Sequence, residues 1–351
     1  MIINLILILN IFTFNFFFTR YTIFMYKSKL NLIDTEKAIK LIKDTFEVKL
    51  AKELNLIRVS GPLFVTKSSG LNDNLNGVEE PVSFKIEGLN DTIEVVHSLA
   101  KWKRNALKVY DILIDSGIYT DMNAIRKDEK EDNLHSIYVD QWDWEKHISL
   151  EERNTLFLKK TVRKIYKAIL STQKLILKKY PVLDRVFEKN ITFISSSKLL
   201  KIYPNLTPKE RENEIAKKYG TVFVTQIGGK LKDGKPHDLR APDYDDWKLN
   251  GDLLVFYKPL DQAVEISSMG IRVDKNSLTK QLKITNNLDR LSLPFHKDLL
   301  NDKLPLSIGG GIGQSRLCLV LLNKIHIGEV QSSIWNESES LKTKKENIKL
   351  L

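Results

Sequence analysis

The sequence predicts an α+β fold in which helices flank a mainly antiparallel β-sheet. Segments with strand alternation and segments with helical periodicity do not follow one another regularly, which argues against a doubly wound parallel sheet. Two strand-like segments, 82–86 and 92–98, lie close together in the sequence, as in an antiparallel hairpin. The chain has 351 residues and is 42% hydrophobic, so it can bury a substantial core.

The first residues stand apart from the rest of the chain. The stretch "MIINLILILNIFTFNFFF" has the apolar length of a membrane span and carries no charge before Arg20. The basic n-region and the cleavage site of a signal peptide are missing. An amphipathic helix begins after Met25, with Asp34 as its expected N-cap. We therefore interpret 1–24 as a mis-called start and 25–351 as a single domain; a real membrane anchor is the alternative.

Further elements follow in order. They are a strand over 55–65, a polar loop over 66–77, the hairpin of 82–86 and 92–98, and a helix over 99–113. Pro62 would break a central ladder, so the strand that contains it belongs at an edge or an interface. His97 ends the hairpin and is expected to be a hydrogen-bonded core residue.

The segment "HSIYVDQWDWEK" (135–146) has the strongest strand alternation in the chain. One face would carry Ile137, Val139, Gln141, Asp143 and Glu145, and the other Tyr138, Asp140, Trp142 and Trp144. Asp and Glu are poor strand formers, so an amide and two carboxylates on one face favour a ligand site. A solvated edge strand is the alternative.

The second half continues the mixed pattern. It comprises a lysine-rich helix over 151–180, a helix, strand and hairpin turn over 214–238, a charged loop over 239–252, strands over 253–258 and 263–274, and a further helix. The stretch 307–322, "SIGGGIGQSRLCLVLL", is expected to be a glycine-rich loop entering a buried helix at Gln314. It matches neither the dinucleotide fingerprint nor the phosphate loop, because Arg316 replaces the third glycine and no Lys-Ser/Thr follows.

Composition limits the classes of function. The formal charge is +11, but lysines alternate with acids, as in "KDEKED" (127–132), which favours solubility over a nucleic-acid partner. No paired Cys/His zinc spacing and no internal repeat is found. Cys318 is the single cysteine and lies in an apolar run, so we expect a core residue in a reducing, cytoplasmic compartment.

Carboxylates and cations mark a candidate site. Asp252 and Glu265 lie in apolar strand contexts, and such oxygen ligands suit Mg²⁺ bound with phosphates. The acids Asp243, Asp245 and Asp246 fit the same purpose or an acidic surface loop. Among the cations, Lys101, Lys103 and Arg104 would diverge on a helix, so at most two reach a common site.

Four arginines each border a glycine-rich or acidic segment: Arg126, Arg240, Arg272 and Arg316. Arginine suits bidentate contact with phosphate or carboxylate, although each could be a surface charge. Glycines at 309, 310, 311 and 313 would let the backbone approach a ligand, and Arg316 would project from a helix N-terminus that favours anions. Together with the carboxylates and without a Walker motif, these residues indicate ATP used to adenylate a carboxylate.

Six motifs occur in the order known from one family: "EVVHSLAKWKR", "HSIYVDQWDWEK", "RAPDYDDW", "NGD", "EISSMGIRVD" and "GGGIGQSRL". From about Met25 to about Asn336 the chain closely resembles the ammonia-dependent asparagine synthetases, or aspartate–ammonia ligases. The resemblance implies a catalytic domain like that of class II aminoacyl-tRNA synthetases without an anticodon-binding domain. It also implies a homodimer with the strand around Pro62 at its interface.

The resemblance assigns roles to named residues. An aspartate pocket is implied for Asp73, Ser98, Lys103, Gln141, Asp143, Ser268 and Arg272. ATP binding is implied for Arg126, Arg240, Asp252, Glu265, Gly311, Gly313 and Arg316, with Asp252 and Glu265 as the Mg²⁺ ligands. The catalytic set is Arg126, Arg316, Lys103 and Asp245.

The implied reaction amidates L-aspartate with ammonia through β-aspartyl-AMP and releases AMP and pyrophosphate. Ammonia rather than glutamine is expected, because a glutaminase needs an activated nucleophile and Cys318 is predicted to be buried. Asp143 and Asp245 are candidate bases. No nucleic-acid partner and no membrane is expected unless 1–24 is real. A class II tRNA synthetase and a non-catalytic nucleotide-binding paralogue are the alternatives.

Overall fold

The fold is built around one large sheet, seen in a computed structural model that describes residues 26–73, 75 and 79–351. From edge to edge its strands are β1 (Leu56–Arg58), β5 (Gly117–Ile125), β6 (Tyr138–His147), β11 (Ser307–Gly313), β10 (Gln262–Arg272), β9 (Asp245–Tyr257), β8 (Thr221–Thr225) and β7 (Thr192–Ser195). The outermost pairs, β1 with β5 and β7 with β8, are parallel, and all other neighbours are antiparallel. The predicted α+β class with a mainly antiparallel sheet is confirmed.

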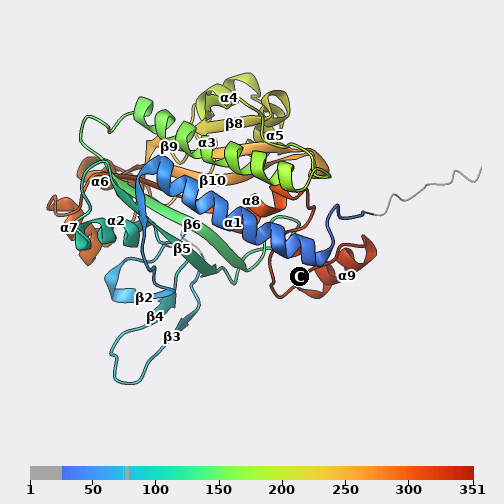
Figure 1. Cartoon of the computed structure of the whole chain (residues 1–351). Coiled ribbons are helices and arrows are strands. Elements are labelled where there is room, and N and C mark those ends of the chain that lie inside the picture. The colour runs from blue at the N-terminus through green and yellow to red at the C-terminus, as the bar shows by residue number, and fades with distance from the viewer. Residues whose placement is uncertain (1–25, 74, 76–78) are drawn as a thin grey trace, which may run out of the picture.

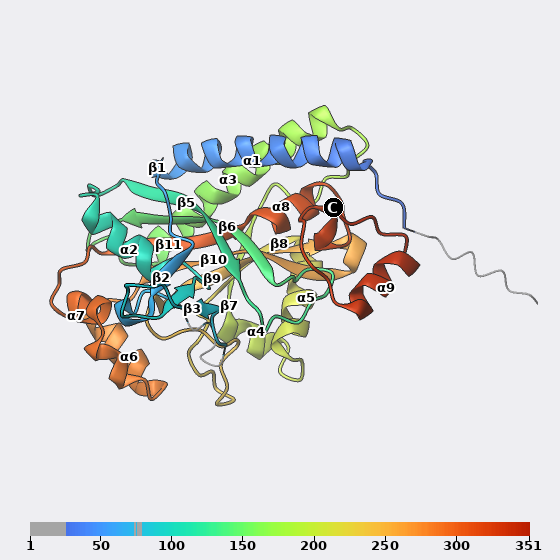
Figure 2. The same cartoon turned by 90° about the horizontal axis from the view of Figure 1, so that it is seen from below.

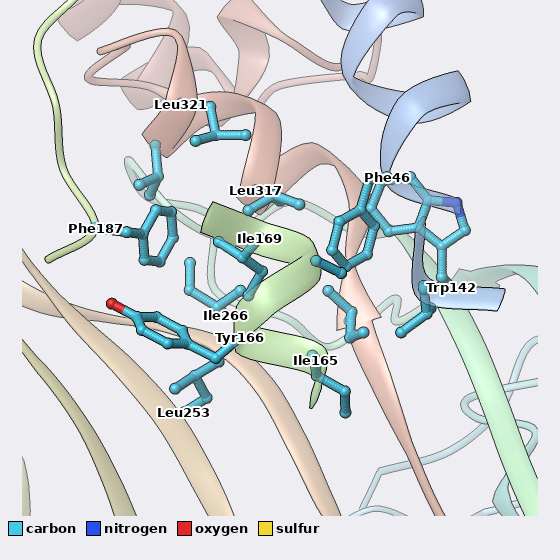
Figure 3. Packing of buried hydrophobic residues seen from close by; sticks show 14 of the residues in the cluster. Phe46, Trp142, Ile165, Tyr166, Ile169, Phe187, Leu253, Ile266, Leu317 and Leu321 are labelled. Carbon is cyan, nitrogen blue, oxygen red and sulfur yellow. The ribbon is translucent and has the colours of Figure 1, made fainter. Parts of the chain in front are cut away.

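Two long helices, α1 (Leu32–Leu54) and α3 (Thr155–Lys179), lie side by side on one face of the sheet (Figures 1 and 2). Buried side chains of α3 recur at helical spacing and face the strands, and the predicted lysine-rich helix is confirmed. The main core forms here, with the rings of Phe46 and Trp142 4.7 Å apart beside Ile165 and Leu317 (Figure 3). This face therefore supplies stability, and the other face is left for chemistry.

The other face is covered by α2 (Ala100–Val109), by α6 (Lys275–Ile284) and α7 (Pro294–Leu300), and by a small antiparallel sheet (Figure 2). That sheet has the strand order β2 (Phe64–Thr66), β4 (Ile93–Val95) and β3 (Ser83–Phe84). Its β3–β4 pair is the predicted hairpin. The remaining helices are α4 (Ser196–Ile202), α5 (Pro208–Tyr219), α8 (Gln314–Leu321) and α9 (Glu337–Lys345), with short 3-10 helices η1 (Lys67–Ser69), η2 (Lys258–Leu260), η3 (Leu288–Ser292) and η4 (Ile327–Glu329).

Three local predictions need correction near the amino terminus. The N-cap of α1 is Asn31, whose side chain accepts from the Asp34 N–H, so Asp34 lies in the first turn of the helix rather than at its cap. The expected strand over 55–65 is divided into β1 and β2, with Pro62 between them. Strand β5 was not predicted, because its polar side chains obscure the alternation; Asp121, for example, pairs with Arg58 at 2.7 Å.

Two segments predicted as loops are strands. Residues 239–252 were expected to form a charged loop, but β9 begins at Asp245. This is possible because Asp245 is paired with Arg272, and Asp246 with Arg153 at 2.6 Å. The glycine-rich segment forms β11, an inner strand between β6 and β10, and the expected helix follows it as α8 with Cys318 fully buried.

The extension 1–24 lies outside the described residues, so the prediction about it stays a prediction. Within the part of the chain that the structure describes, no helix combines the length and apolar character needed to cross a membrane.

Candidate active site

A cavity of about 400 Å³ lies against β6, β11 and β10, beside α2. Every predicted site residue except Asp252 lines it, including side chains as distant in sequence as Asp73 and Arg316. The sheet brings them together because Gln141 and Asp143 on β6, Gly311 on β11 and Ser268 on β10 are neighbours across three strands.

One end of the cavity is fully buried and closed by ion pairs. We call it the inner end and define it by Lys103, Asp143, Asp245 and Arg272, which line the cavity, and by Glu145, which lies behind Arg272. Lys103 of α2 is 1% exposed, and its Nζ lies 2.9 Å from Asp143 Oδ2 and donates to the Gly310 carbonyl at 2.9 Å. Burial lowers the pKa of the Lys103 ammonium group, which Asp143 partly offsets. The inner end therefore holds a desolvated cation at a fixed place.

Arg272 is the second cation of the inner end. Its Nε and Nη2 donate to Glu145 at 3.0 and 2.7 Å, and its Nη1 donates to Asp245 at 2.5 Å. Burial disfavours the charged form, but Glu145 and Asp245 outweigh it and raise the pKa of Arg272. Burial raises the pKa of the Asp245 carboxyl, with Arg272 opposing. Arg272 thus stays charged although its side chain is almost fully buried.

The other cations of α2 diverge, as the helical geometry predicts. Lys101 Nζ lies 3.3 Å from Asp243, and Arg104 donates to the carbonyls of Val273 and Pro305 at 2.6 and 2.9 Å. Only Lys103 of this group lines the cavity.

A third polar group adjoins the inner end. Ser98 Oγ donates to Asp73 Oδ2 at 3.0 Å, and the Leu75 N–H donates to Asp73 Oδ1 at 3.0 Å. Burial raises the pKa of the Asp73 carboxyl, with Lys101 opposing. His97 is buried and its Nδ1 lies 3.1 Å from the Asp73 carbonyl oxygen, which confirms the predicted hydrogen-bonded core histidine.

The other end of the cavity is half-buried and rich in arginine. We call it the outer end and define it by Arg126, Arg240, Glu265 and Arg316. Arg126 follows β5 and donates to the His97 carbonyl at 3.3 Å, while its Nε is buried without a hydrogen-bond partner. Arg316, in the first turn of α8, donates to the Glu265 carbonyl at 3.1 Å. These guanidinium groups keep donors for an added anion.

Arg240 also enters the outer end, from the segment before β9. It pairs with Asp252 and, at 3.0 Å, with Asp238, and its Nε is buried without a hydrogen-bond partner. Asp252 lies behind the cavity wall, where its Oδ1 has no hydrogen-bond partner. Burial raises the pKa of Glu265, but Arg316 and Arg240 outweigh this and lower it below its ordinary value.

The remaining acids of the 243–246 segment serve the fold. Asp243 is fully buried between Lys101, Arg290 and His296, the last two at 3.1 and 3.0 Å. The charges of Lys101 and Arg290 and the hydrogen bond with His296 outweigh burial and lower the pKa of Asp243. Across the residues described, no group of three or more His, Cys, Asp or Glu side chains is arranged to hold a metal ion.

Some lining residues were not predicted. Glu129 and Gln331 lie in segments without periodicity, and the sequence alone gave no signal for them. His135 is the first residue of the motif 135–146, but it was not singled out as a site residue. Tyr244 lies inside a motif that was recognised, and its ring is 5.7 Å from the Arg272 guanidinium.

The fold places the chain in a known structural class. It superposes on the asparaginyl-tRNA synthetase of Entamoeba histolytica in complex with asparaginyl-adenylate with a TM-score of 0.59 and 16% identity, covering 85% of this chain and 66% of that one. The protein thus has the catalytic fold of class II aminoacyl-tRNA synthetases, as predicted.

Sequence comparison narrows the class to a family. Residues 33–347 match the model of the aspartate–ammonia ligase family. An aspartate–ammonia ligase of Clostridium perfringens is 58% identical over 327 residues, 93% of this chain and 97% of the relative. One of Fusobacterium nucleatum is 57% identical over 326 residues, with 93% and 99% covered. The chain belongs to the aspartate–ammonia ligase family.

Proposed function

We propose that this protein amidates L-aspartate with ammonia at the expense of ATP, through β-aspartyl-AMP, and releases AMP and pyrophosphate. One observation carries the proposal: the cavity joins a buried end with two fixed cations, Lys103 and Arg272, to a half-buried end with three arginines. A small dicarboxylate fits the first end and a polyphosphate fits the second.

In the first step the β-carboxylate of aspartate attacks the α-phosphorus of ATP. Lys103 and Arg272 hold the two carboxylates of aspartate, while carboxylates such as Asp73 and Asp143 accept hydrogen bonds from its ammonium group. Arg126 and Arg316 stabilise the negative charge that grows on the phosphates as pyrophosphate leaves. Placement of fixed charges in a dry site supplies the catalysis, and no protein nucleophile is required.

In the second step ammonia attacks the activated carbonyl and AMP leaves. Ammonium must first lose a proton, and a carboxylate beside the reacting carbon can take it. Asp245 suits this role because it lines the cavity and burial raises its pKa toward that of a useful base. Asp143 lines the same cavity and, like Asp245, is paired with a buried cation, so it is the alternative base.

Magnesium is part of the proposal. Glu265 faces the cavity with a lowered pKa, so its carboxylate suits a hard cation. Asp252 has a buried Oδ1 without a partner but lies behind the cavity wall, where burial raises its pKa, so it would serve as a second ligand only after turning toward the cavity. Bound there with the ATP phosphates, Mg²⁺ would neutralise charge on the leaving pyrophosphate. The main-chain carbonyl of Glu265 would keep Arg316 oriented, since it accepts a hydrogen bond from Arg316 Nη1.

We further propose a cytoplasmic homodimer. Apolar side chains around Pro62 support it, since Ile57, Leu63 and Phe64 are each about half exposed beside edge strand β1. Buried Cys318 fits a reducing compartment. Sedimentation of the purified protein tests the dimer.

The experiment is an incubation with ATP, Mg²⁺, aspartate and either ammonium or glutamine, with assay of asparagine and of adenine nucleotides. We expect asparagine with ammonium and AMP as the nucleotide product. ADP in stoichiometric amount would contradict the adenylate route. Transfer of the amino acid to RNA would support the alternative of a class II tRNA synthetase. Binding of ATP without turnover would support the alternative of a non-catalytic nucleotide-binding paralogue.

A further inference from the structure

The ion pair between Glu145 and Arg272 crosses a strand. Glu145 is on β6 and Arg272 is on β10, and β11 lies between them. Even so, the Arg272 side chain donates to Glu145 through both Nε and Nη2. The residue of β11 paired with Glu145 is Gly309. The two side chains therefore meet above Gly309.

Gly309 has no room for a side chain. A Cβ atom there would lie 1.9 Å from Glu145 Oε2 and 2.5 Å from Arg272 Nη2, far inside van der Waals contact. The backbone of Gly309 has no left-handed conformation that would itself demand glycine. The absence of a side chain, rather than backbone freedom, is what the ion pair requires at this position.

The two carboxylates bound to Arg272 are not equivalent. Glu145 is fully buried, takes one whole edge of the guanidinium group and also accepts a hydrogen bond from Ser307 Oγ at 2.6 Å. It does not line the cavity, whereas Asp245 and Arg272 both do. Glu145 is thus a fixed partner of Arg272. Asp245 binds the part of the Arg272 guanidinium group that faces the cavity and that a substrate could reach.

We propose that Glu145 is a positioning residue that orients Arg272 toward a carboxylate of aspartate, and that Gly309 is needed to let the two side chains meet. This inference rests on the proposed function. A guanidinium group held along one edge presents its remaining donors in one direction, so the separation from Lys103 is fixed. Without Glu145, Arg272 would turn toward Asp245 and lose its alignment with the substrate.

The test measures aspartate-dependent exchange of pyrophosphate into ATP at varied aspartate and varied ATP. We expect Glu145→Gln and Gly309→Ala each to raise the KM for aspartate on the order of tenfold or more, the effect of losing a charged hydrogen bond. The KM for ATP should stay unchanged. Gly229→Ala is the matched control, since a Cβ there would meet nothing within 4 Å.

A milder variant keeps the test decisive if either change prevents folding. Ser307→Ala removes one hydrogen bond to Glu145 and leaves every charge in place. It should raise the KM for aspartate by about three- to fivefold, with the KM for ATP unchanged.

The outcomes separate two failures. In the first case the unaltered protein shows aspartate-dependent exchange of pyrophosphate. The role given to Glu145 is then wrong if the folded variants keep the KM for aspartate of the unaltered protein, or if their KM values for aspartate and for ATP rise equally. If the unaltered protein shows no aspartate-dependent exchange, the proposed function is wrong, and the role of Glu145 with it.

Discussion

The inner and outer ends of the cavity are both rich in charge, yet they are built on different principles. At the inner end Lys103 and Arg272 are buried and already paired with Asp143, Glu145 and Asp245. At the outer end the arginines are half-buried, and Arg126 and Arg240 each keep an Nε without a hydrogen-bond partner, although Arg240 is also paired with Asp252 and Asp238. The inner end is therefore preorganised by the protein itself, and the outer end is completed by its anion.

The difference has a physical cause. A desolvated cation without a partner is costly, so the inner end must carry its own counterions before aspartate arrives. An arginine that is partly exposed to water needs no complete set of counterions from the protein, so some of its donors can stay unpaired until phosphate binds. Discrimination between amino acids should thus arise at the inner end, and stabilisation of the leaving group at the outer end. Four predictions test this division, beginning with the largest expected effect.

Removal of an outer-end arginine should give the largest loss. We expect Arg126→Ala and Arg316→Ala each to reduce kcat by about two or more powers of ten, the cost of losing a charge partner of the transition state. AMP formation at saturating aspartate measures it. Exposed Arg185 provides the control, since Arg185→Ala should be silent. Near-normal turnover in both test variants would make these arginines surface charges.

Substrate choice tests the inner end. Glutamate should be used about a hundredfold less well than aspartate, because a displacement of about 1 Å at the reacting oxygen carries a cost of that order. Lys103 and Arg272 fix the distance between the two carboxylates, and an extra methylene moves the attacking oxygen. Competition between the two amino acids in the exchange assay provides the ratio. Equal use would show that the inner end adapts to its ligand.

Replacement of Lys103 should affect both the binding of aspartate at the inner end and the stability of the protein. Lys103→Met should raise the KM for aspartate on the order of tenfold with little effect on ATP, and it should also lower stability by about 3–5 kcal/mol because Asp143 is left buried and unpaired. The double variant Lys103→Met/Asp143→Asn should recover most of the stability but not aspartate use. Thermal unfolding and exchange kinetics separate the two. A higher requirement for ATP alone would assign Lys103 to the outer end.

The smallest expected effect is on the reactivity of Cys318, which lies in α8, the helix that carries Arg316. Burial raises the pKa of the Cys318 thiol to about 12, from 9.0. In the folded state it should stay protonated and resist alkylation up to about pH 10, whereas the unfolded chain should react from about pH 8. The raised pKa contributes stability below pH 9, and this is lost as the pH rises toward 12.

Alkylation with and without ATP then probes the outer end. Equal protection in both conditions would show that α8 is packed before the nucleotide binds. If ATP suppresses labelling, α8 opens when the outer end is empty. The two ends would then differ in the order of their backbone as well as in the pairing of their side chains.

Several helices, the two faces of β6, the family and most site residues could be predicted from the amino-acid sequence. Local periodicity predicted α2, α3 and α8 and the faces of β6, because side chains repeat with a helical or a twofold period whatever the partner. The motifs predicted the family, which comparison confirmed, and named the residues that the structure collects around one cavity. Their individual roles stay predictions.

The pairing of the buried charged side chains could be recognised only in the folded structure. The glycine-rich segment appeared to be a loop, because nothing in its own sequence shows that Glu145 and Arg272 need the space above Gly309. Asp245 and Asp246 likewise appeared to be loop residues until Arg272 and Arg153 were found beside them. A strand that carries glycines or carboxylates is stabilised by partners distant in the sequence, and a local pattern contains no information about those partners.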